Sequence, residues 1–318
     1  MAKTPLFVVT NRKIGKDGPT DKRADTLSYF TGKAGADLTK FDNWVALKGE
    51  AFVKALRAEA ANFPLLPDER NTEQKHVSLF VHGYNTDWSD GVTRYMQIKK
   101  ALYDAADLGV LVLFSWPSNG STAGYLPDRE DARDSGPQTA ELFVRLHEVV
   151  AAEQRLAAAT NDPKKMCRAK ISVIAHSMGN YVVQKGLAVA AKRLNSPQLV
   201  TLVHQLAMVA ADVDNDLFQT DRAQEEDGSL MSNLCYRIGA LYTGLDDVLG
   251  ASAGLKHFGK RRLGRSGLAD ADAVWDNVFH ADVSDLIVKK DIHSAVFDSP
   301  KSLALLEKLL RGVDRKHF

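Results

Sequence analysis

The chain has 318 residues, of which 45% are hydrophobic and 25% are charged, and its formal net charge is +1. This composition is typical of a globular protein that is long enough to bury a sizeable core. The nearly equal numbers of basic and acidic residues argue against nucleic acid or an anionic membrane surface as a partner.

The N-terminal part of the chain mixes two strand patterns, a helix pattern and an irregular segment. Residues 5–11 are apolar and predict a short buried strand, whereas 12–36 are rich in Gly, Lys, Asp and Thr and predict a loop. Residues 43–49 are a candidate strand. Residues 50–63 carry apolar side chains at helical spacing and therefore predict an amphipathic helix.

From residue 77 onwards, apolar runs of strand length alternate with longer helical patterns. This alternation predicts β-α-β units and a mostly parallel sheet with helices on both faces. The predicted strands are 77–83, 109–117, 169–177, 203–213, 235–243 and 274–280. The predicted helices are 89–107, 137–157, 178–194 and 299–312. Residues 219–233 predict a loop or an exposed helical turn, and 254–272 predict a long loop. We expect one domain over residues 1–318, with N-terminal strands and a helix in 1–75 and the core in 76–311.

The segment ISVIAHSMGNYVVQKGL, residues 171–187, changes from a strand pattern to a helix pattern at a serine. A tight strand-to-helix turn lifts a side chain above the sheet edge and needs small residues two positions before and after it, here Ala175 and Gly179. Ser177 is therefore the candidate nucleophile, although alanine stands where the G-x-S-x-G pattern has its first glycine. The alternative is a serine that only caps the helix.

A serine nucleophile needs a histidine base and an acid that orients the base, and the chain order Ser, acid, His is expected. His293 is favoured as the base because it lies in a loop just before the last helix. The other downstream histidines are His204, His257, His280 and His317. Asp246 follows the strand 235–243 and is favoured as the acid, with Asp247 as the alternative. Three further aspartates follow the preceding strand: Asp212, Asp214 and Asp216.

The segment FVHGYNTDW, residues 80–88, supplies the second half of the candidate site. The chain turns sharply after a strand, so the N–H groups of Tyr84 and Met178 form a candidate oxyanion hole. Gly83 lets the backbone approach a substrate closely. His82 is either an orienting residue or a buried histidine with satisfied hydrogen bonds.

Four residues are candidates for substrate contact: Gly83, His176, Trp116 and Tyr125. Packing at the edge of the core is the alternative for Trp116. The acidic run 128–134 lacks paired His or Cys residues, so it predicts a solvated helix start and not a metal site. A run of basic residues within 256–265 also predicts a solvated loop. The alternative is that this run recognises a carboxylate or phosphate of a substrate. This run contains Lys256, Lys260, Arg261, Arg262 and Arg265.

The cysteines and the chain start bear on the compartment. Cys167 and Cys235 lie far apart, which argues against a disulfide framework and is typical of a reducing compartment. The first residues do not resemble a signal peptide, and no apolar run approaches the about 18 residues of a membrane span. The sequence therefore predicts a cytoplasmic protein and leaves its oligomeric state open.

Several segments resemble, in order and at comparable distances, the bacterial family catalogued as "alpha/beta hydrolase of unknown function". They are FVHGYNTDWSDGVTRYMQI, VLFSWPSNGSTAGYLPDREDARDS, VIAHSMGNYVVQKGL, AADVDNDLF and IHSAVFDSP. The resemblance implies a three-layer α/β-hydrolase fold and a Ser-Asp-His serine hydrolase, with Ser177 as nucleophile and His293 as base. The family's acid lies in a D-x-A-L-like segment, which DDVLGAS matches with Asp246 first. The family often has glycine before the histidine, where this chain has Ile292.

The sequence thus predicts a hydrolase that cleaves an ester bond of a small molecule through an acyl-enzyme, as a carboxylesterase or lipase does. No metal or organic cofactor is required for this chemistry. A thioesterase, an amidase or an acyltransferase would use the same groups. A non-catalytic binding protein on the same fold is the alternative from another class of proteins.

Overall fold

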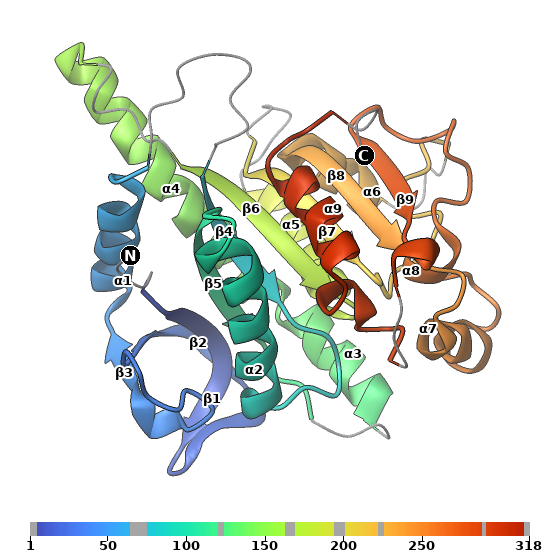
Figure 1. The fold of residues 1–318 in the computed structure, drawn as a ribbon, viewed down its shortest axis with the longest axis horizontal. Helices are drawn as coiled ribbons and strands as arrows, with labels where there is room; N and C mark the ends of the chain where they lie inside the picture. The colour runs from blue at the N-terminus through green and yellow to red at the C-terminus, as the bar shows by residue number, and fades with distance from the viewer. Residues whose placement is uncertain are drawn as a thin grey trace.

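The computed structural model describes the chain in seven segments: residues 5–63, 75–119, 124–162, 169–193, 201–221, 226–287 and 291–314. The side chains at 255 and 256 are not described, and Cys167 and His317 lie outside the described residues. Within the described segments, nine strands form one sheet in the order β3-β2-β1-β5-β4-β6-β7-β8-β9 (Figure 1).

Seven strands of this sheet run parallel to one another. They are β1 (Phe7–Gly15), β4 (His76–Val81), β5 (Gly109–Ser115), β6 (Lys170–His176), β7 (Val203–Val209), β8 (Cys235–Tyr242) and β9 (Val278–Asp282). β2 (Gly18–Gly32) pairs antiparallel with β1, and β3 (Trp44–Leu47) pairs antiparallel with β2. The carboxyl ends of the parallel strands therefore meet at one edge of the sheet.

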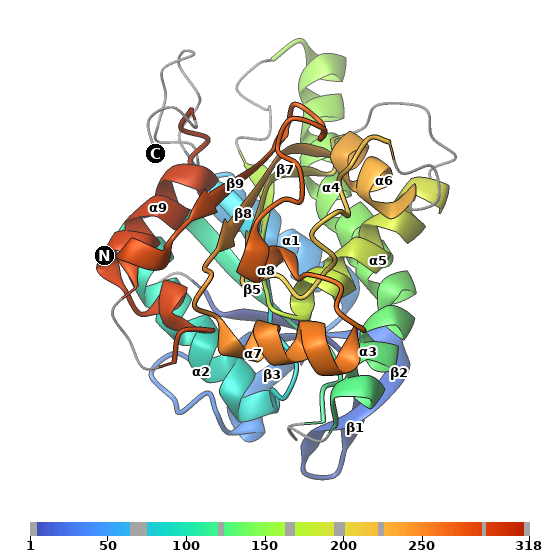
Figure 2. The same ribbon diagram turned by 90° about the vertical axis from the view of Figure 1, so that its right-hand side faces the viewer.

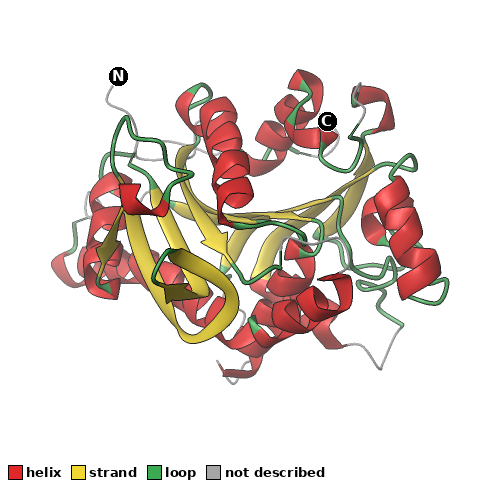
Figure 3. Cartoon of the chain, turned by 90° about the horizontal axis from the view of Figure 1, so that it is seen from below, coloured by secondary structure: helices red, strands yellow, loops and turns green. Residues whose placement is uncertain are grey.

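Helices cover both faces of the sheet, as Figure 3 shows. One face packs against α1 (Gly49–Ala60), α4 (Gly136–Thr160), α5 (Gly179–Arg193) and α6 (Glu226–Leu234). The other face packs against α2 (Trp88–Ile98) and α9 (Pro300–Leu310). Successive strand residues point to opposite faces, so Leu79 joins the first cluster of buried side chains and Phe80 joins the second. The predicted mostly parallel, three-layer α/β fold is confirmed.

Short helices gather near the carboxyl edge of the sheet (Figure 2). They are α3 (Tyr125–Asp134), α7 (Asp247–Ala251) and α8 (Leu263–Ser266). The remaining turns are π-helical or 3-10: Phe41–Asn43, Lys99–Asp104, Ser252–Lys256, Ser284–Leu286 and Ala295–Phe297. No helix of the described segments is long and apolar enough to cross a membrane.

The prediction of a loop over residues 12–36 is wrong. β1 extends to Gly15, and β2 returns from Gly18 to form a long hairpin. Gly18 has φ 118°, a conformation that glycine adopts without steric cost at such a turn. The outer part of β2 is exposed or half-buried on both faces, so its polar sequence lacks the alternation that marks a half-buried strand.

Three smaller predictions also need correction. The interval 219–233 overlaps α6, whose inner side is buried, and the interval 254–272 contains α8. The strand predicted over 274–280 begins only at Val278 and continues to Asp282. The assignment of residues 1–318 to a single domain stays a prediction.

Candidate active site

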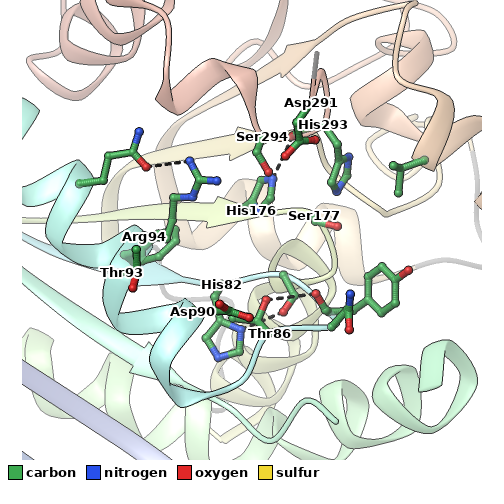
Figure 4. A pocket seen from close by; sticks show the side chains of 16 residues that line it. His82, Thr86, Asp90, Thr93, Arg94, His176, Ser177, Asp291, His293 and Ser294 are labelled. Carbon is green, nitrogen blue, oxygen red and sulfur yellow. Dashed lines mark hydrogen bonds between the residues drawn. The ribbon is translucent and has the colours of Figure 1, made fainter. Parts of the chain in front are cut away.

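A cavity of about 510 Å³ lies beside the carboxyl ends of β4 and β6 (Figure 4). Its wall comes from the end of β4 and the loop after it, from α2, from the end of β6, and from residues around 248 and 291–294. Ligands of parallel α/β sheets bind at this edge. The cavity brings together six residues that the sequence singled out: His82, Gly83, Tyr84, His176, Ser177 and His293.

Ser177 stands at a tight turn between β6 and α5. Its φ is 52°, in the left-handed region that residues other than glycine rarely adopt. A Cβ atom at Gly179 would lie 2.5 Å from the carbonyl oxygens of Val81 and His82, so only glycine fits there. Ala175 is fully buried with its methyl group in place. The alanine in this motif is therefore compatible with the turn.

The side chain of Asn180 stabilises this strained turn through hydrogen bonds to its backbone. Its Nδ2 donates to the carbonyl oxygens of Ala175 and Ser177, each at 3.0 Å. The N–H of Ser177 donates to the carbonyl oxygen of Val209 at 3.0 Å. A backbone conformation that costs free energy persists where the surrounding hydrogen bonds determine it in this way.

His293 and Asp246 form a direct hydrogen bond. His293 Nδ1 lies 2.7 Å from Asp246 Oδ2, and the Asp246 side chain is fully buried. The second oxygen, Oδ1, accepts from the N–H of Leu249 at 2.9 Å and so caps α7. The side chain of Asp247 is 96% exposed and lies 3.4 Å from Arg265. The structure thus brings Asp246, and not Asp247, to the histidine.

The other described histidines downstream of Ser177 make their contacts elsewhere. The ring of His204 stacks on Tyr236, and His257 lies against Tyr125. His280 Nδ1 accepts from the N–H of Leu268 at 2.7 Å.

Gly83 and Ser177 are in close contact across the cavity. A Cβ atom at Gly83 would lie 2.9 Å from Ser177 Cβ and 3.4 Å from Ser177 Oγ. Glycine therefore permits the loop to pass the serine at this distance. Tyr84 and Met178, the two residues predicted to form the oxyanion hole, each directly follow one member of this contact. Met178 also precedes the first residue of α5.

His82 and Trp116 support the loop that carries Gly83. Their rings stack with centroids 5.3 Å apart, and Trp116 Nε1 donates to the carbonyl oxygen of His82 at 2.7 Å. Burial, together with the charge of Arg12, lowers the pKa of His82 to about 3, so the ring is neutral at pH 7. Trp116 is fully buried and does not line the cavity, in contrast to its predicted contact with substrate.

His176 lines the cavity next to the serine. Its Nε2 lies 3.1 Å from the carbonyl oxygen of His293, and the two rings are 5.0 Å apart. Burial is the largest effect on the pKa of His176 and lowers it well below its usual value. A neutral His176 therefore contacts the backbone of the segment that carries His293.

Tyr125 lies behind the serine, outside the cavity wall, in a buried network. Its hydroxyl is 2.7 Å from Asp212 Oδ2 and 2.5 Å from His257 Nε2. Asp212 Oδ1 accepts from Arg262 Nε at 2.8 Å, and the N–H of Asp212 donates to the carbonyl oxygen of Ser177 at 3.1 Å. Arg262 is fully buried, so the prediction that the basic run is solvated is wrong for this residue.

Arg12 and Asp128 anchor the loop on the other side of the cavity. Asp128 Oδ2 accepts from the N–H of Asn85 at 3.1 Å and from the Ser118 hydroxyl at 2.5 Å. Arg12 Nη2 donates to the carbonyl oxygen of Thr86 at 2.7 Å. Asp128 is fully buried, so the predicted solvated helix start is wrong for this carboxylate.

Sequence reasoning missed the supporting roles of Arg12, Asp128 and Asn180. The burial of Arg12 is visible only in the folded chain, because the two residues that precede it in the sequence are the polar Thr10 and Asn11. No local signal marks Asp128 either, because it opens a run of charged residues.

The sheet, its two helix layers and the serine at a strand-to-helix turn define the architecture of an α/β hydrolase. A family model described as "alpha/beta hydrolase of unknown function" matches residues 59–311. The chain belongs to this family.

A relative of the chain is itself uncharacterized, so it gives no information about activity. The uncharacterized protein alr1448 of Nostoc sp. is 27% identical over 173 residues, which covers 48% of this chain and 38% of the relative. The chain thus spans well under two thirds of that relative's length.

Three solved structures have low similarity to the chain. Lipase B of Aspergillus fumigatus is 16% identical over 80% of this chain and 56% of the lipase, with a TM-score of 0.35. An esterase of Pyrobaculum calidifontis is 10% identical over 84% of this chain and 93% of the esterase, with a TM-score of 0.37. An acylaminoacyl peptidase of Pyrococcus horikoshii is 14% identical over 91% of this chain and 47% of the peptidase, with a TM-score of 0.31. These identities and TM-scores carry no conclusion about the reaction.

Proposed function

We propose that the protein is a serine hydrolase that cleaves an ester bond of a small molecule, with Ser177, His293 and Asp246 as its catalytic triad. One observation carries this proposal. The bond of 2.7 Å between His293 Nδ1 and Asp246 Oδ2 lies beside the cavity that Ser177 and His293 line together. A carboxylate on Nδ1 directs Nε2 as the proton acceptor, which is the arrangement that serine activation needs.

In the proposed first step, Ser177 Oγ attacks the ester carbonyl carbon while His293 Nε2 takes the hydroxyl proton. The buried carboxylate of Asp246 stabilises the resulting imidazolium. The tetrahedral intermediate then collapses, His293 gives its proton to the departing alkoxide, and the acyl group stays on Ser177. Water, deprotonated by His293, attacks this acyl-enzyme and releases the acid.

In this proposal, the backbone N–H groups of Tyr84 and Met178 stabilise the negative charge of the tetrahedral oxygen. Support for this assignment comes from the close contact of Gly83 with Ser177, because each N–H belongs to the residue after one partner of that contact. Fixed donors of this kind stabilise the developing oxyanion more than the ground-state carbonyl.

The first test uses the purified chain and a fluorophosphonate probe, which labels an activated serine. We expect labelling of the parent protein and of Ser28→Ala, a control on β2 away from the cavity. We expect no labelling of Ser177→Ala. Hydrolysis of p-nitrophenyl acetate is measured on the same three proteins and is expected to follow the labelling.

Thermal melting of each protein accompanies the assay, so that a loss of folding is not mistaken for a loss of chemistry. Labelling of folded Ser177→Ala at the level of the parent would exclude this serine as the nucleophile. A folded parent that is neither labelled nor active on the ester would favour a non-catalytic binding protein.

A further inference from the structure

Most of the residues that line the cavity have polar or charged side chains. Among the described residues that line it, Phe80 and Val248 are the ones with purely hydrocarbon side chains. Pockets for fatty acyl chains are lined mainly by aliphatic and aromatic groups. A long hydrocarbon chain would leave polar groups of this wall without hydrogen-bond partners, which costs free energy. The lining therefore favours a short acyl group that carries a polar or charged end.

Among the described residues that line the cavity, Arg94 is the one with a lysine or arginine side chain. It belongs to α2. Its Nη1 donates to Gln97 Oε1 at 2.9 Å and lies 3.6 Å from Asp298 Oδ1. The same Asp298 oxygen accepts from Gln97 Nε2 at 2.5 Å. The ion pair is thus longer than a hydrogen bond and its acceptor is shared.

The guanidinium of Arg94 has room for another acceptor. It carries five N–H donors in a planar fork that fits a carboxylate with two parallel hydrogen bonds. In the described part of the chain, the hydrogen bond and the ion pair of Arg94 both involve Nη1. Nε and the second amino group are the donors that a bound anion would use.

Aromatic contacts connect Arg94 to the candidate triad. The guanidinium lies 5.5 Å from the centre of the Phe297 ring, and that ring is 5.3 Å from the ring of His176. His176 precedes Ser177 and contacts the backbone of His293. Figure 4 shows Arg94 on one side of His176 and Ser177 on the other. The Arg94 guanidinium and the His176 ring thus both lie against the Phe297 ring, and Arg94 and Ser177 line the same cavity.

Two carboxylates also line the cavity. Asp90 lies on α2, four residues before Arg94, and is beside Thr86 and His82 in Figure 4, whereas Asp291 lies beside His293. Both are apart from Arg94 in this view, which shows Arg94 next to His176. The wall thus presents its cation at one place, and a negative group of the substrate is favoured there.

We propose that Arg94 determines specificity by binding a carboxylate at the far end of the acyl group, so that the substrates are esters of short dicarboxylic acids. This inference rests on the proposed function, because it places the ester carbonyl at Ser177. It names a substrate class that differs from the fatty acyl esters of a lipase.

The test compares two esters of equal chain length, the p-nitrophenyl half-ester of glutaric acid and p-nitrophenyl pentanoate. We expect the parent protein to prefer the half-ester by at least about tenfold in kcat/KM, the effect of a hydrogen-bonded charge pair. In Arg94→Met, which replaces the guanidinium side chain with a shorter, unbranched and uncharged one, the ratio of the two kcat/KM values is expected to fall by about tenfold or more. Arg94→Lys should recover part of the ratio, because it restores the charge without the planar fork.

Lys100→Met is the matched control, since it removes one exposed positive charge just beyond α2 and is not part of the cavity wall. We expect its ratio to equal that of the parent. An unchanged ratio in Arg94→Met, or a parent that prefers the pentanoate, would overturn the inference. An equal fall in Lys100→Met would reduce the effect to general electrostatics, which also contradicts it.

A binding measurement separates this inference from the proposed function. Titration calorimetry with glutarate needs no turnover, and we expect glutarate to bind the parent at least about tenfold more tightly than Arg94→Met. If neither ester is hydrolysed but glutarate binding depends on Arg94, the serine hydrolase proposal fails and the anion site stands. Equal binding to both proteins contradicts the anion site whatever the outcome of the esterase assay.

Discussion

The two sides of the cavity hold charged groups in different ways. On the side of β4, the buried charges bind the main chain, because Asp128 accepts from the N–H of Asn85 and Arg12 donates to the carbonyl of Thr86. On the side of β8 and β9, the buried carboxylate of Asp246 binds the side chain of His293. The first side fixes the position of backbone groups, whereas the second presents a side chain that can exchange a proton.

One histidine on each side, His82 and His293, shows the same difference between a main-chain partner and a side-chain partner. His82 Nδ1 lies 2.8 Å from the carbonyl oxygen of Gly83, and His293 Nδ1 lies 2.7 Å from the carboxylate of Asp246. A neutral carbonyl stabilises an imidazolium less than a carboxylate does. Since burial lowers the pKa of His82 to about 3, this ring does not take up a proton at neutral pH. The two histidines thus differ in the partner of Nδ1, a neutral carbonyl for His82 and a carboxylate for His293.

Replacement of the two histidines should give the largest difference between the sides. We expect His293→Ala to lower kcat for p-nitrophenyl acetate by about a millionfold, the loss seen when the base of a triad is removed. For His82→Asn we expect a loss below about a hundredfold, since only the position of the loop is disturbed. Equal losses in two folded variants would contradict the assignment of roles.

Replacement of the two carboxylates should separate chemistry from stability. We expect Asp246→Asn to lower kcat by about 10,000-fold, because an amide stabilises the wrong tautomer of His293. Its stability should change little, since asparagine also caps a helix such as α7. We expect Asp128→Asn to lower the free energy of unfolding by about 1–3 kcal/mol through lost charge-assisted hydrogen bonds.

Urea unfolding and steady-state kinetics on the same samples measure both quantities for this pair of variants. A large loss of stability in Asp246→Asn, with kcat retained, would reverse the two roles. The contrast would disappear if both variants lost stability and activity to the same extent.

The two buried arginines should differ in their effect on stability and in its dependence on pH. Removal of Arg262 leaves Asp212 buried without its partner, and we expect Arg262→Met to cost about 3–5 kcal/mol at pH 7. Arg12 donates to carbonyl oxygens and to the Ser115 hydroxyl. For Arg12→Met we therefore expect about 1–3 kcal/mol, the cost of unsatisfied uncharged acceptors.

The sign of the pH effect follows from Asp212. Burial alone would raise the pKa of its carboxyl group, but Arg262 and other cations lower it overall. Its contribution to stability in the parent is therefore present above the unfolded pKa and is lost as the pH falls through the folded pKa. Without Arg262, burial is expected to raise the pKa, so Asp212 takes up a proton at a higher pH. The deficit of Arg262→Met should thus shrink between pH 7 and pH 4, and urea unfolding across this range checks it.

The sequence predicted the elements whose pattern is local. Ser177 stands at a change of period between a strand and a helix, and the alternation from residue 77 onwards determines a parallel sheet. Chain order then directed attention to Asp246 and His293, which the structure brings into contact. The sequence favoured Asp246 but left its neighbour Asp247 as an alternative, since the exposures of the two side chains differ only in the folded chain.

The errors concern residues whose environment depends on distant partners. Arg262 and Asp128 lie in charged runs, and a charged run is on average solvated. Their burial follows from Asp212 and from the turn at Asn85, both far away along the chain. The hairpin of β1 and β2 was missed for the opposite reason, because its outer strand buries too little surface to leave an alternating pattern.

The dual contact of Asp246 has a consequence for redesign of this protein. One carboxylate oxygen receives His293 and the other receives the first turn of α7. Glutamate, with one more methylene group, cannot keep both contacts without moving the helix or the histidine segment. The acid and the helix therefore form one transplantable unit, and a grafting experiment must carry them together.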